Sequence, residues 1–321
     1  RRGEFLGRGS QSAEELVDIL LVRERGTTDT RVQDELGNNE DLREGLVHLL
    51  ENGNADGLYW GCVAMSYLVH RNAANNKLMG RTPNVFLGLR RALGEGGCNE
   101  VACSVLSQLA FCNKDNSEAI ADTEGLLESL VDAMKNEPRM GQQAAACALS
   151  NCTANSAKVA LRVASIPSMI DSLTVLCREH TSACSETSRL GVSAIGCLDN
   201  LSFYDAVRPV LRAKGVVATL LPIVHSPARG ERPTVMAAES AMIIARLTPT
   251  KELPTLRVPP AVVKTIVHCL RCAVDGEQWA NFAWRLGDVL EPLWCLAHSA
   301  AHRDVLARCG CVRELLRALQ L

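Results

Sequence analysis

The feature that most constrains this chain is a seven-residue phrase that recurs six times at long, nearly regular intervals. Each phrase ends at an apolar anchor residue, and successive anchors are 41, 43, 49, 46 and 49 residues apart. The anchors are Leu68, Leu109, Cys152, Leu201, Leu247 and Leu296. Three residues before each anchor stands another large apolar residue, namely Met65, Leu106, Leu149, Leu198, Ile244 or Leu293. Because residues three apart share a helical face, each phrase predicts a helix that packs through its anchor.

A second helical phrase follows each anchor after a polar stretch. Most copies begin at or beside Gly or Pro, as in GLLESLVDAM from Gly125, GVVATLLPIV from Gly215 and PPAVVKTIVHCL from Pro259. Such a start is typical of a helix that follows a tight turn, because the first helical N–H groups have no partner within the helix. Each unit is therefore predicted to be a short helix, a sharp turn, a second helix and a longer third helix that ends in the anchor phrase.

This pattern resembles the armadillo repeat. The phrases GVVATLLPIV, AAACALSNC and IGCLDNLS look like the second helix and the end of the third helix of that repeat, and the resemblance covers roughly residues 40–321. Ankyrin and tetratricopeptide arrays have shorter periods of ~33–34 residues, whereas the period of a HEAT array overlaps and leaves that alternative open. The Gly or Pro start and the short polar helix expected at 113–122 favour armadillo repeats.

We therefore expect an all-α fold, a right-handed α-solenoid superhelix of armadillo repeats. Hydrophobic residues make up 47% of the chain and aromatic residues only 4%, which suits closely packed helices. Residues 1–11 are expected to be disordered or vector-derived, 12–39 to form a helical N-terminal cap, and 40–321 to form about six to seven units. Within the cap, Ser12 and Glu15 have the spacing of a capping box. The phrase from Gly310 has no third helix after it, so the array ends, or was cut, within a unit.

Charge and cysteine content bear on the class of protein. The formal net charge is -2, with an acidic start (7 Lys+Arg against 13 Asp+Glu in residues 1–60) and a basic end (15 against 9 in residues 206–321). Solvated helix faces or different partners at the two ends explain this equally well. Many of the 14 cysteines lie in apolar helical runs, which favours reduced core thiols and a cytoplasmic location. No membrane-spanning run is present, while tethering or nuclear import through segments outside this sequence stays open.

The resemblance implies a concave groove lined by the third helices. In the family, an Asn one residue before the anchor hydrogen-bonds the backbone of an extended peptide, and Asn151 and Asn200 match it. The equivalent positions elsewhere hold Tyr67, Gln108, Arg246 and Cys295. One turn earlier, the same face carries Val63, Ser104, Cys147, Gly196, Met242 and Glu291. The two asparagines could instead cap their own helices, since Asn readily hydrogen-bonds nearby backbone.

Tryptophans separate this chain from one branch of the family. Nuclear-import adaptors carry Trp at the earlier groove position, where this chain has none, so lysine-rich localisation peptides are not its expected ligands. Trp60 and Tyr67 are seven residues apart and could form an aromatic anchor on one face, or pack beneath the cap. The other three tryptophans lie in a stretch expected to be helical, 277–296, and are expected to be core aromatics. They are Trp279, Trp284 and Trp294.

Candidate metal sites are weak. The cysteine pairs 269/272 and 309/311 lie on predicted helices a repeat apart, which does not suit a tetrahedral zinc site. Helical spacing also places four possible metal ligands on one face, namely Glu291, Cys295, His298 and His302. The anchor phrase predicts, however, that the helix ends near Ala297, which separates the two histidines from the other two residues. No metal site, cofactor or catalytic motif is expected.

We expect a non-enzymatic protein–protein interaction scaffold or adaptor, which binds a partner peptide or helix along the groove. The predicted contact residues are Asn151, Asn200, Gln108, Tyr67, Arg246, Ser104, Met242 and Trp60. The alternative is a regulatory domain whose groove binds a small ligand such as a nucleotide, which would need a compact pocket with convergent Arg and aromatic side chains. Direct nucleic-acid binding is not expected. The partner, the cellular process and the oligomeric state do not follow from the sequence.

Overall fold

The computed structural model describes residues 11, 13–19, 21–22, 27–28, 30–181, 189–226, 231–279 and 282–320. The chain divides into two compact units, unit 1 (Arg1–Met169) and unit 2 (Ile170–Leu321). Ser12 of the predicted capping box lies outside the described residues, as do residues 1–10, for which disorder or a vector origin was predicted.

Unit 1 consists of successive helix triplets. Residues 13–19 are helical, and a short antiparallel hairpin follows, β1 (Leu21–Val22) with β2 (Thr27–Thr28). The first triplet is α2 (Thr30–Asn38), α3 (Glu40–Asn52) and α4 (Ala55–Val69). The second is α5 (Ala73–Gly80), α6 (Val85–Leu93) and α7 (Asn99–Ala110). The third is α8 (Lys114–Asp122), α9 (Leu126–Asn136) and α10 (Arg139–Ala154), after which comes α11 (Ala157–Ser165).

Unit 2 has the same order of helices, except that the 3-10 helix η1 replaces one first helix and that a hairpin separates α17 from α18. Its helices begin with α12 (Met169–Thr181), α13 (Arg189–Ser202), α14 (Arg208–Ala213), α15 (Val216–His225) and α16 (Glu231–Leu247). The 3-10 helix η1 (Thr250–Thr255) and α17 (Pro260–Asp275) precede an antiparallel hairpin, β3 (Gln278–Trp279) with β4 (Phe282–Ala283). The last helices are α18 (Leu286–Ala297), α19 (Ala300–Arg308) and α20 (Cys311–Ala318).

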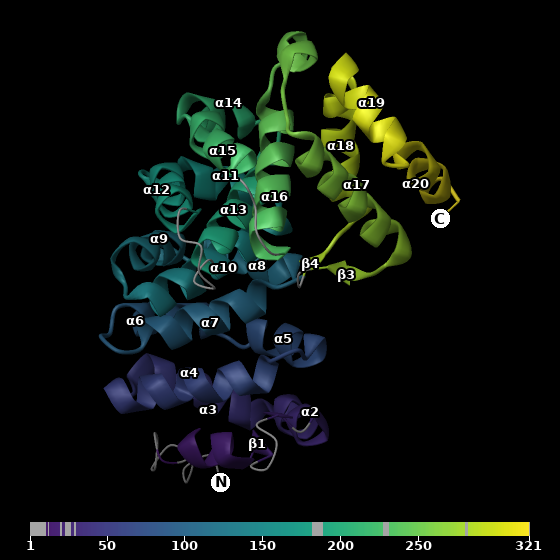
Figure 1. Cartoon of the computed structure of the whole chain (residues 1–321). Helices are drawn as coiled ribbons and strands as arrows, with labels where there is room; N and C mark the ends of the chain where they lie inside the picture. The colour runs from purple at the N-terminus through teal and green to yellow at the C-terminus, as the bar shows by residue number, and fades with distance from the viewer. Residues whose placement is uncertain are drawn as a thin grey trace. The chain divides into compact units, whose positions relative to one another are not determined.

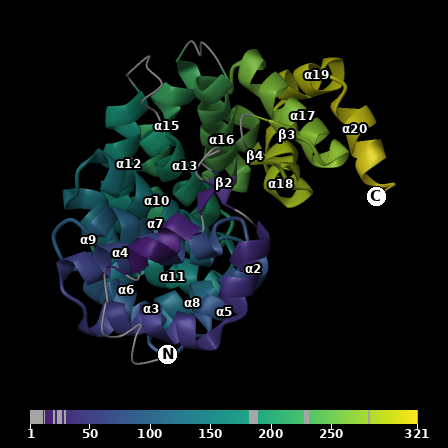
Figure 2. The ribbon, with the colours of Figure 1, turned by 90° about the horizontal axis from the view of Figure 1, so that it is seen from below.

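The third helices of unit 1 form its continuous centre. α7 packs against both α4 and α10, while α3 packs against α6 and α6 against α9 in a second layer. Figure 1 shows the pairs α3–α4, α6–α7 and α9–α10 following one another along the unit. Figure 2, seen from below, places α4, α7 and α10 over one another. Each helix pair therefore covers the apolar face of the next, as expected of a repeat array.

The predicted register is confirmed by burial. All six anchors, from Leu68 to Leu296, are 0% exposed. The apolar residues three positions earlier are also buried, with Leu293 the most exposed at 4%. The period of the anchor phrases thus marks the core positions of the third helices in both units.

The predicted tight turns are also present. The residue just before α6, α9, α12, α15 and α20 has a left-handed backbone, with φ between 63° and 79°. Glycine occupies three of these positions (Gly125, Gly215 and Gly310), because it alone adopts this conformation without steric cost. Asn84 and Ser168 fill the other two, each after a proline that fixes the preceding turn residue. α17 starts differently, at a Pro–Pro pair with an extended N-cap.

The helix expected over 277–296 is wrong in its first half. Gly276 has φ of 68° and ends α17, and the strands β3 (Gln278–Trp279) and β4 (Phe282–Ala283) come before α18 starts. Trp284 is buried as predicted, Trp279 is half-buried, and Trp294 is 56% exposed and was wrongly predicted to lie in the core. α18 ends at Ala297, as the anchor phrase predicted.

Both histidines of the four-residue set follow the end of α18, with His298 as its C-cap and His302 on α19, whereas Glu291 and Cys295 lie within α18. The buried His302 ring accepts a hydrogen bond from the backbone N–H of Val258, at 3.0 Å from Nε2. Within the described ranges, no group of three or more His, Cys, Asp or Glu side chains is placed to hold a metal ion. No single helix among these residues is long and apolar enough to cross a membrane, although the bent pair α11–α12 reaches that length jointly.

Candidate partner-binding face

Twelve residues of unit 1 repeat the same partial exposure on three neighbouring third helices. They stand eight, five, two and one residues before each anchor, and all are half-buried. We call them the third-helix face: Trp60, Val63, Ser66 and Tyr67 on α4; Val101, Ser104, Ser107 and Gln108 on α7; Ala144, Cys147, Ser150 and Asn151 on α10. This spacing keeps them on one side of each helix while the anchors point into the core. None of the twelve is Asp, Glu, Lys or Arg, so the surface is uncharged.

Amide side chains connect neighbouring helices across this face. Gln108 donates from Nε2 to Ser66 Oγ on the preceding third helix, at 2.7 Å. Asn151 donates from Nδ2 to the carbonyl oxygen and Oγ of Ser107, again on the preceding third helix, at 2.9 and 3.0 Å. The residue one position before an anchor thus hydrogen-bonds to the residue two positions before the anchor of the preceding repeat. Asn151 does not cap its own helix in this way, so the capping alternative is wrong for it.

The amide bonds fix which groups the face presents. Because the Asn151 N–H groups are committed to Ser107, the acceptor that this amide keeps for other partners is its Oδ1, whereas Gln108 Oε1 is buried and has no hydrogen-bond partner among the described residues. A serine hydroxyl both donates and accepts hydrogen bonds, so the face can pair with the N–H and C=O groups of an extended backbone. Ser66 and Ser107 were not predicted as site residues. Their position two before the anchor was the only sequence signal for them.

Aromatic side chains border the face at α4. Trp60 and Tyr67 are both half-buried on it, so they share a face as their spacing predicted, and Trp60 is not in the core. The Trp60 ring packs edge-on against Tyr59, with ring centroids 5.4 Å apart, and Tyr59 is 40% exposed. Partly exposed, immobilised aromatic rings are the side chains that most often anchor a protein partner.

Solved structures share the helical-repeat backbone of this chain. A designed armadillo repeat protein aligns with a TM-score of 0.61 at 14% identity, covering 77% of this chain and 100% of that chain. A chain from a structure of the interaction between cadherin and beta-catenin, which a conserved phosphorylation switch controls, has a TM-score of 0.61 at 15% identity. That match covers 97% of this chain and 54% of the other. A designed armadillo repeat protein in complex with the peptide (KR)4 has a TM-score of 0.59 at 14% identity, over 73% and 92% of the two chains.

This chain has the armadillo-repeat fold. The all-α solenoid predicted from the anchor phrases is thereby confirmed. No family model matches the sequence, and no curated protein matches it. The likeness is thus one of backbone arrangement, and the side chains on the armadillo third helices must be judged from this chain itself.

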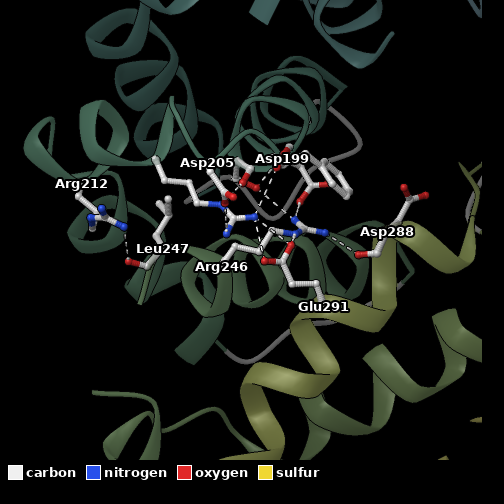
Figure 3. A network of polar contacts seen from close by, with 10 residues as sticks. Asp199, Asp205, Arg212, Arg246, Leu247, Asp288 and Glu291 are labelled. Atoms are coloured by element: carbon white, nitrogen blue, oxygen red, sulfur yellow. Dashed lines mark hydrogen bonds and ion pairs between the residues drawn. The ribbon is translucent and has the colours of Figure 1, made fainter. Parts of the chain in front are cut away.

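In unit 2, five of the same armadillo positions are charged; Asp199, Glu239 and Arg246 among them are buried, whereas Asp288 and Glu291 are half-buried. The position eight before the anchor holds Glu239 on α16 and Asp288 on α18, and the position five before holds Glu291 on α18. Asp199 on α13 stands two before its anchor, and Arg246 on α16 stands one before. Arg246 joins Asp199, Asp288 and Glu291 in one polar network (Figure 3). Glu239 is buried near Asp199, and its Oε2 has no hydrogen-bond partner among the described residues. The positions that are uncharged and half-exposed in unit 1 are therefore largely used for internal contacts in unit 2.

Arg246 is the centre of this network, and its prediction as a contact residue is wrong. Its side chain is 0% exposed, and its Nη1 lies 2.6 Å from Asp199 Oδ1. It also donates to the Asp288 carbonyl oxygen, lies 3.6 Å from Glu291 and stacks over the Phe203 ring at 4.0 Å. These contacts hold the buried guanidinium inside the unit, while its Nε makes only the longer ion pair with Glu291 and no hydrogen bond.

Met242 is also wrongly predicted to be on the surface, since it is 0% exposed. α16 packs against α13, α15, α17 and α18, and residues 235–247 are all buried. A third helix surrounded in this way has no side left for a partner. Asn200 is half-buried on α13, and Ser104, Gln108, Tyr67, Trp60 and Asn151 lie together on the unit 1 face.

Arg208 on α14 extends the network outward. Its Nη2 donates to Glu291 at 2.9 Å, its Nη1 lies 2.9 Å from Asp205, and its Nε donates to the Ser202 carbonyl oxygen at 2.7 Å. Burial raises the pKa of Asp199, and the neighbouring Arg246 opposes that rise. Burial, together with the Asp199 carboxylate, raises the pKa of Glu239 well above its usual range. The network joins α13, α14, α16 and α18 to one another.

Proposed function

We propose that this chain is a non-enzymatic scaffold that binds a peptide segment of a partner protein on the third-helix face of unit 1. The observation that carries the proposal is the repetition of the same four uncharged, half-buried positions on α4, α7 and α10. A surface on which equivalent positions recur at regular intervals suits a ligand whose groups also recur regularly. An extended peptide presents an N–H group and a side chain at regular intervals.

The chemistry of the face narrows the partner. Its serine hydroxyls and the Asn151 Oδ1 suit the N–H and C=O groups of a backbone, and small side chains such as Ser104 and Cys147 at its middle leave room for bulky residues of the peptide. The aromatic pair Tyr59–Trp60 would anchor one end. A peptide with apolar or aromatic side chains and few charges fits these features best. The armadillo protein crystallised with a Lys-Arg peptide supports peptide binding by the fold, but this uncharged face suits a different sequence.

The proposal includes a cytoplasmic location. All thirteen cysteines in the described part of the chain are free thiols, and ten of them are buried. Such a chain is suited to a reducing compartment. The alternative function predicted from the sequence, a regulatory domain whose groove binds a small ligand, would need convergent Arg and aromatic side chains in the groove, and the twelve residues of the third-helix face include no Arg.

The test is a steric block at the centre of the face. Peptides would be selected from a random display library on the wild-type protein, and their affinities measured for wild type and for Ser104→Arg. We expect the substitution to weaken binding at least tenfold, because the long side chain would lie across the peptide path. Ser129→Arg is the matched control, since Ser129 is a half-buried serine on the second helix α9 of the same unit.

Folding must be checked in the same experiment. Both variants should keep the helical circular dichroism and the unfolding midpoint of the wild type, because Ser104 and Ser129 are only half-buried. Selected peptides that bind Ser104→Arg as tightly as wild type would remove this face from the function. Equal loss of binding in Ser129→Arg would have the same consequence.

A further inference from the structure

Unit 2 contains a pocket of about 350 Å³ beside its second helix α17. It is lined by six residues of α17, by Trp279 of the hairpin β3–β4 and by Cys309 at the end of α19, and it is partly open to solvent. This volume is at the lower end of the range for small-molecule sites. The pocket takes no part in the third-helix face or in the ionic network around Arg246.

Three nitrogen-bearing side chains of α17 line the pocket, Lys264, His268 and Arg271. They are four and three residues apart and so stand on successive turns of one helical face. At a rise of 1.5 Å per residue, Lys264 and Arg271 are separated by about 10 Å along the axis, with His268 between them. Because the two outer side chains are long, both can bend over the middle turn and reach one anion there.

The charges around the pocket are not balanced. No carboxylate lines it among the described residues. Arg271 lies 3.4 Å from Glu314 through its Nε, but that carboxylate also accepts hydrogen bonds from Arg313 at 2.8 Å and Arg317 at 2.6 Å. The Arg313 hydrogen bond holds the pKa of Glu314 below its usual value, so it carries a single full negative charge. Arg317 also pairs with Asp275, so two carboxylates balance three guanidinium groups and leave this cluster with one net positive charge.

Trp279 supplies an aromatic wall. The hairpin pairs Trp279 with Phe282 and Gln278 with Ala283, which fixes the backbone that carries the indole. The ring stands edge-on to His268, with centroids 4.8 Å apart and planes at 75°, and it is half-buried. This hairpin interrupts the repeat between α17 and α18, so the aromatic wall is an addition to the armadillo unit.

We propose that this pocket binds a phosphate monoester carried beside a planar ring. Lys264 and Arg271 hold the phosphoryl group, His268 donates to it between them, and the ring packs against Trp279. A phosphate monoester carries close to two negative charges at neutral pH and so matches two cations, whereas a carboxylate would match only one. Nucleoside monophosphates and phosphotyrosine both present this chemistry. The site goes beyond the proposed scaffold function and is independent of it.

Isothermal titration calorimetry on the full chain tests the proposal with four probes: adenosine monophosphate, phosphotyrosine, adenosine and inorganic phosphate. At least one of the two ring-bearing phosphates should bind tenfold more tightly than adenosine and inorganic phosphate do. Lys264→Glu should weaken that binding at least tenfold, because it replaces a cation with a repelling anion. Lys251→Glu, which reverses another exposed lysine of unit 2 outside the pocket, should leave the affinity unchanged.

Each outcome of the titrations either supports or overturns the proposal. Binding of adenosine monophosphate alone supports the proposal with a free nucleotide as the source, and binding of phosphotyrosine alone supports it with a modified protein as the source. Absence of binding at millimolar concentration, inorganic phosphate that binds as tightly as the ring-bearing probes, or full affinity in Lys264→Glu would each overturn it. Lys264 is exposed, so loss of folding is not expected, and circular dichroism of the variant checks this. The result does not depend on Ser104, so each proposal can fail alone.

Discussion

Equivalent residues of this chain have opposite roles in the two units. One position before the anchor, Gln108 and Asn151 are half-exposed amides, whereas Arg246 is buried among acidic groups and a phenyl ring. The difference lies in the neighbours, since Arg246 meets Asp199 and Glu291 where unit 1 offers serines. A buried ion pair is stable only when geometry and further hydrogen bonds compensate for lost hydration, and here the contacts supply both. The residue type at a groove position therefore does not by itself identify a binding residue.

Glu239 leads to a prediction about pH at the residue scale. Its carboxyl group is 4% exposed, its Oε2 has no hydrogen-bond partner among the described residues, and Asp199 and Asp288 face it together with Arg246. Since burial raises its pKa in the folded state, the folded protein holds a proton that the unfolded chain releases above about pH 4.5. This residue therefore costs stability as pH rises from that value toward its folded pKa.

Glu239→Gln should remove this cost. The variant should match wild type most closely near pH 4.5 and then gain relative stability as pH rises, by at most about 1.4 kcal/mol per pH unit. Urea unfolding at pH 5, 6 and 7 measures the difference, with the exposed Glu252→Gln as a control for loss of a carboxylate. A difference between Glu239→Gln and wild type that stays constant with pH would contradict a raised pKa.

At the scale of elements, asparagines join two first helices of unit 1, α5 and α8, to their neighbours. Asn72 and Asn113 are the N-caps of α5 and α8, and each accepts a hydrogen bond from the backbone N–H three residues later, at 3.0 Å. The residue at that position is again Asn in both helices. Asn75 and Asn116 donate to the carbonyl oxygens of the preceding anchors, each at 2.9 Å. The sequence Asn-x-x-Asn four residues after an anchor is therefore a second signature of the repeat.

The second asparagine also bonds to the first helix of the preceding triplet, and that contact needs a glycine. Asn116 donates to the Asn76 carbonyl oxygen at 3.2 Å and to its Oδ1 at 2.8 Å. A Cβ added at Gly80 would stand 2.0 Å from Asn116 Oδ1, and one at Gly37 would stand 2.0 Å from Asn75 Oδ1. The pairs α2–α5 and α5–α8 approach this closely only because the earlier helix of each pair carries glycine at the contact.

Gly80→Ala should therefore destabilise unit 1, by about 1–3 kcal/mol, because Asn116 must leave its buried hydrogen bonds to make room. Gly287→Ala is the matched control in another helix, where nothing stands within 4 Å of the added Cβ. It should be neutral or stabilise by about 0.5–1 kcal/mol through helix propensity. Urea unfolding followed by circular dichroism compares them, and combining Gly80→Ala with Asn116→Ala tests the cause. Equal stability of Gly80→Ala and wild type would show that the contact is not tight.

For the molecule as a whole, periodic burial made the fold predictable. Anchor spacing identified the third helices, and Gly or Pro starts identified the turns, because both depend on local geometry that repeats. The hairpin β3–β4 was not predictable in this way, since the described residues show no hairpin between the second and third helices of any other repeat, and it was taken for helix. The exposure of Trp294 was missed for a related reason, because side-chain type alone does not tell what covers a helix.

The candidate site was predicted only in part, for physical reasons. The unit 1 positions followed from the register, since half-exposure on one face is a property of helix period. The burial of Met242 and Arg246 depends on α16 being surrounded by four helices, and the ionic network depends on pairs 42 to 47 residues apart. The pocket on α17 joins residues from a helix, a hairpin and the end of α19. Contacts between residues so far apart in the chain follow from three-dimensional packing and leave no periodic pattern in a single sequence.

Thiols distributed over both units allow the predicted core to be tested throughout the chain. Cys112 is exposed, whereas Cys62, Cys103, Cys177 and Cys269 are fully buried. Burial raises the pKa of the Cys103 thiol to about 12 and raises the pKa of the other three as well, so their reactive thiolate forms are scarce while the protein is folded.

Pulsed alkylation at pH 8, read out by mass spectrometry, should therefore label Cys112 at least a hundredfold faster than the four buried thiols in native buffer, and all five at similar rates in strong denaturant. As urea increases, Cys62 and Cys103 in unit 1 should lose protection together, and Cys177 and Cys269 in unit 2 should do the same, because neighbouring helices share one core. Native labelling of Cys103 as fast as that of Cys112 would contradict the buried third helix on which both the anchor register and the third-helix face depend.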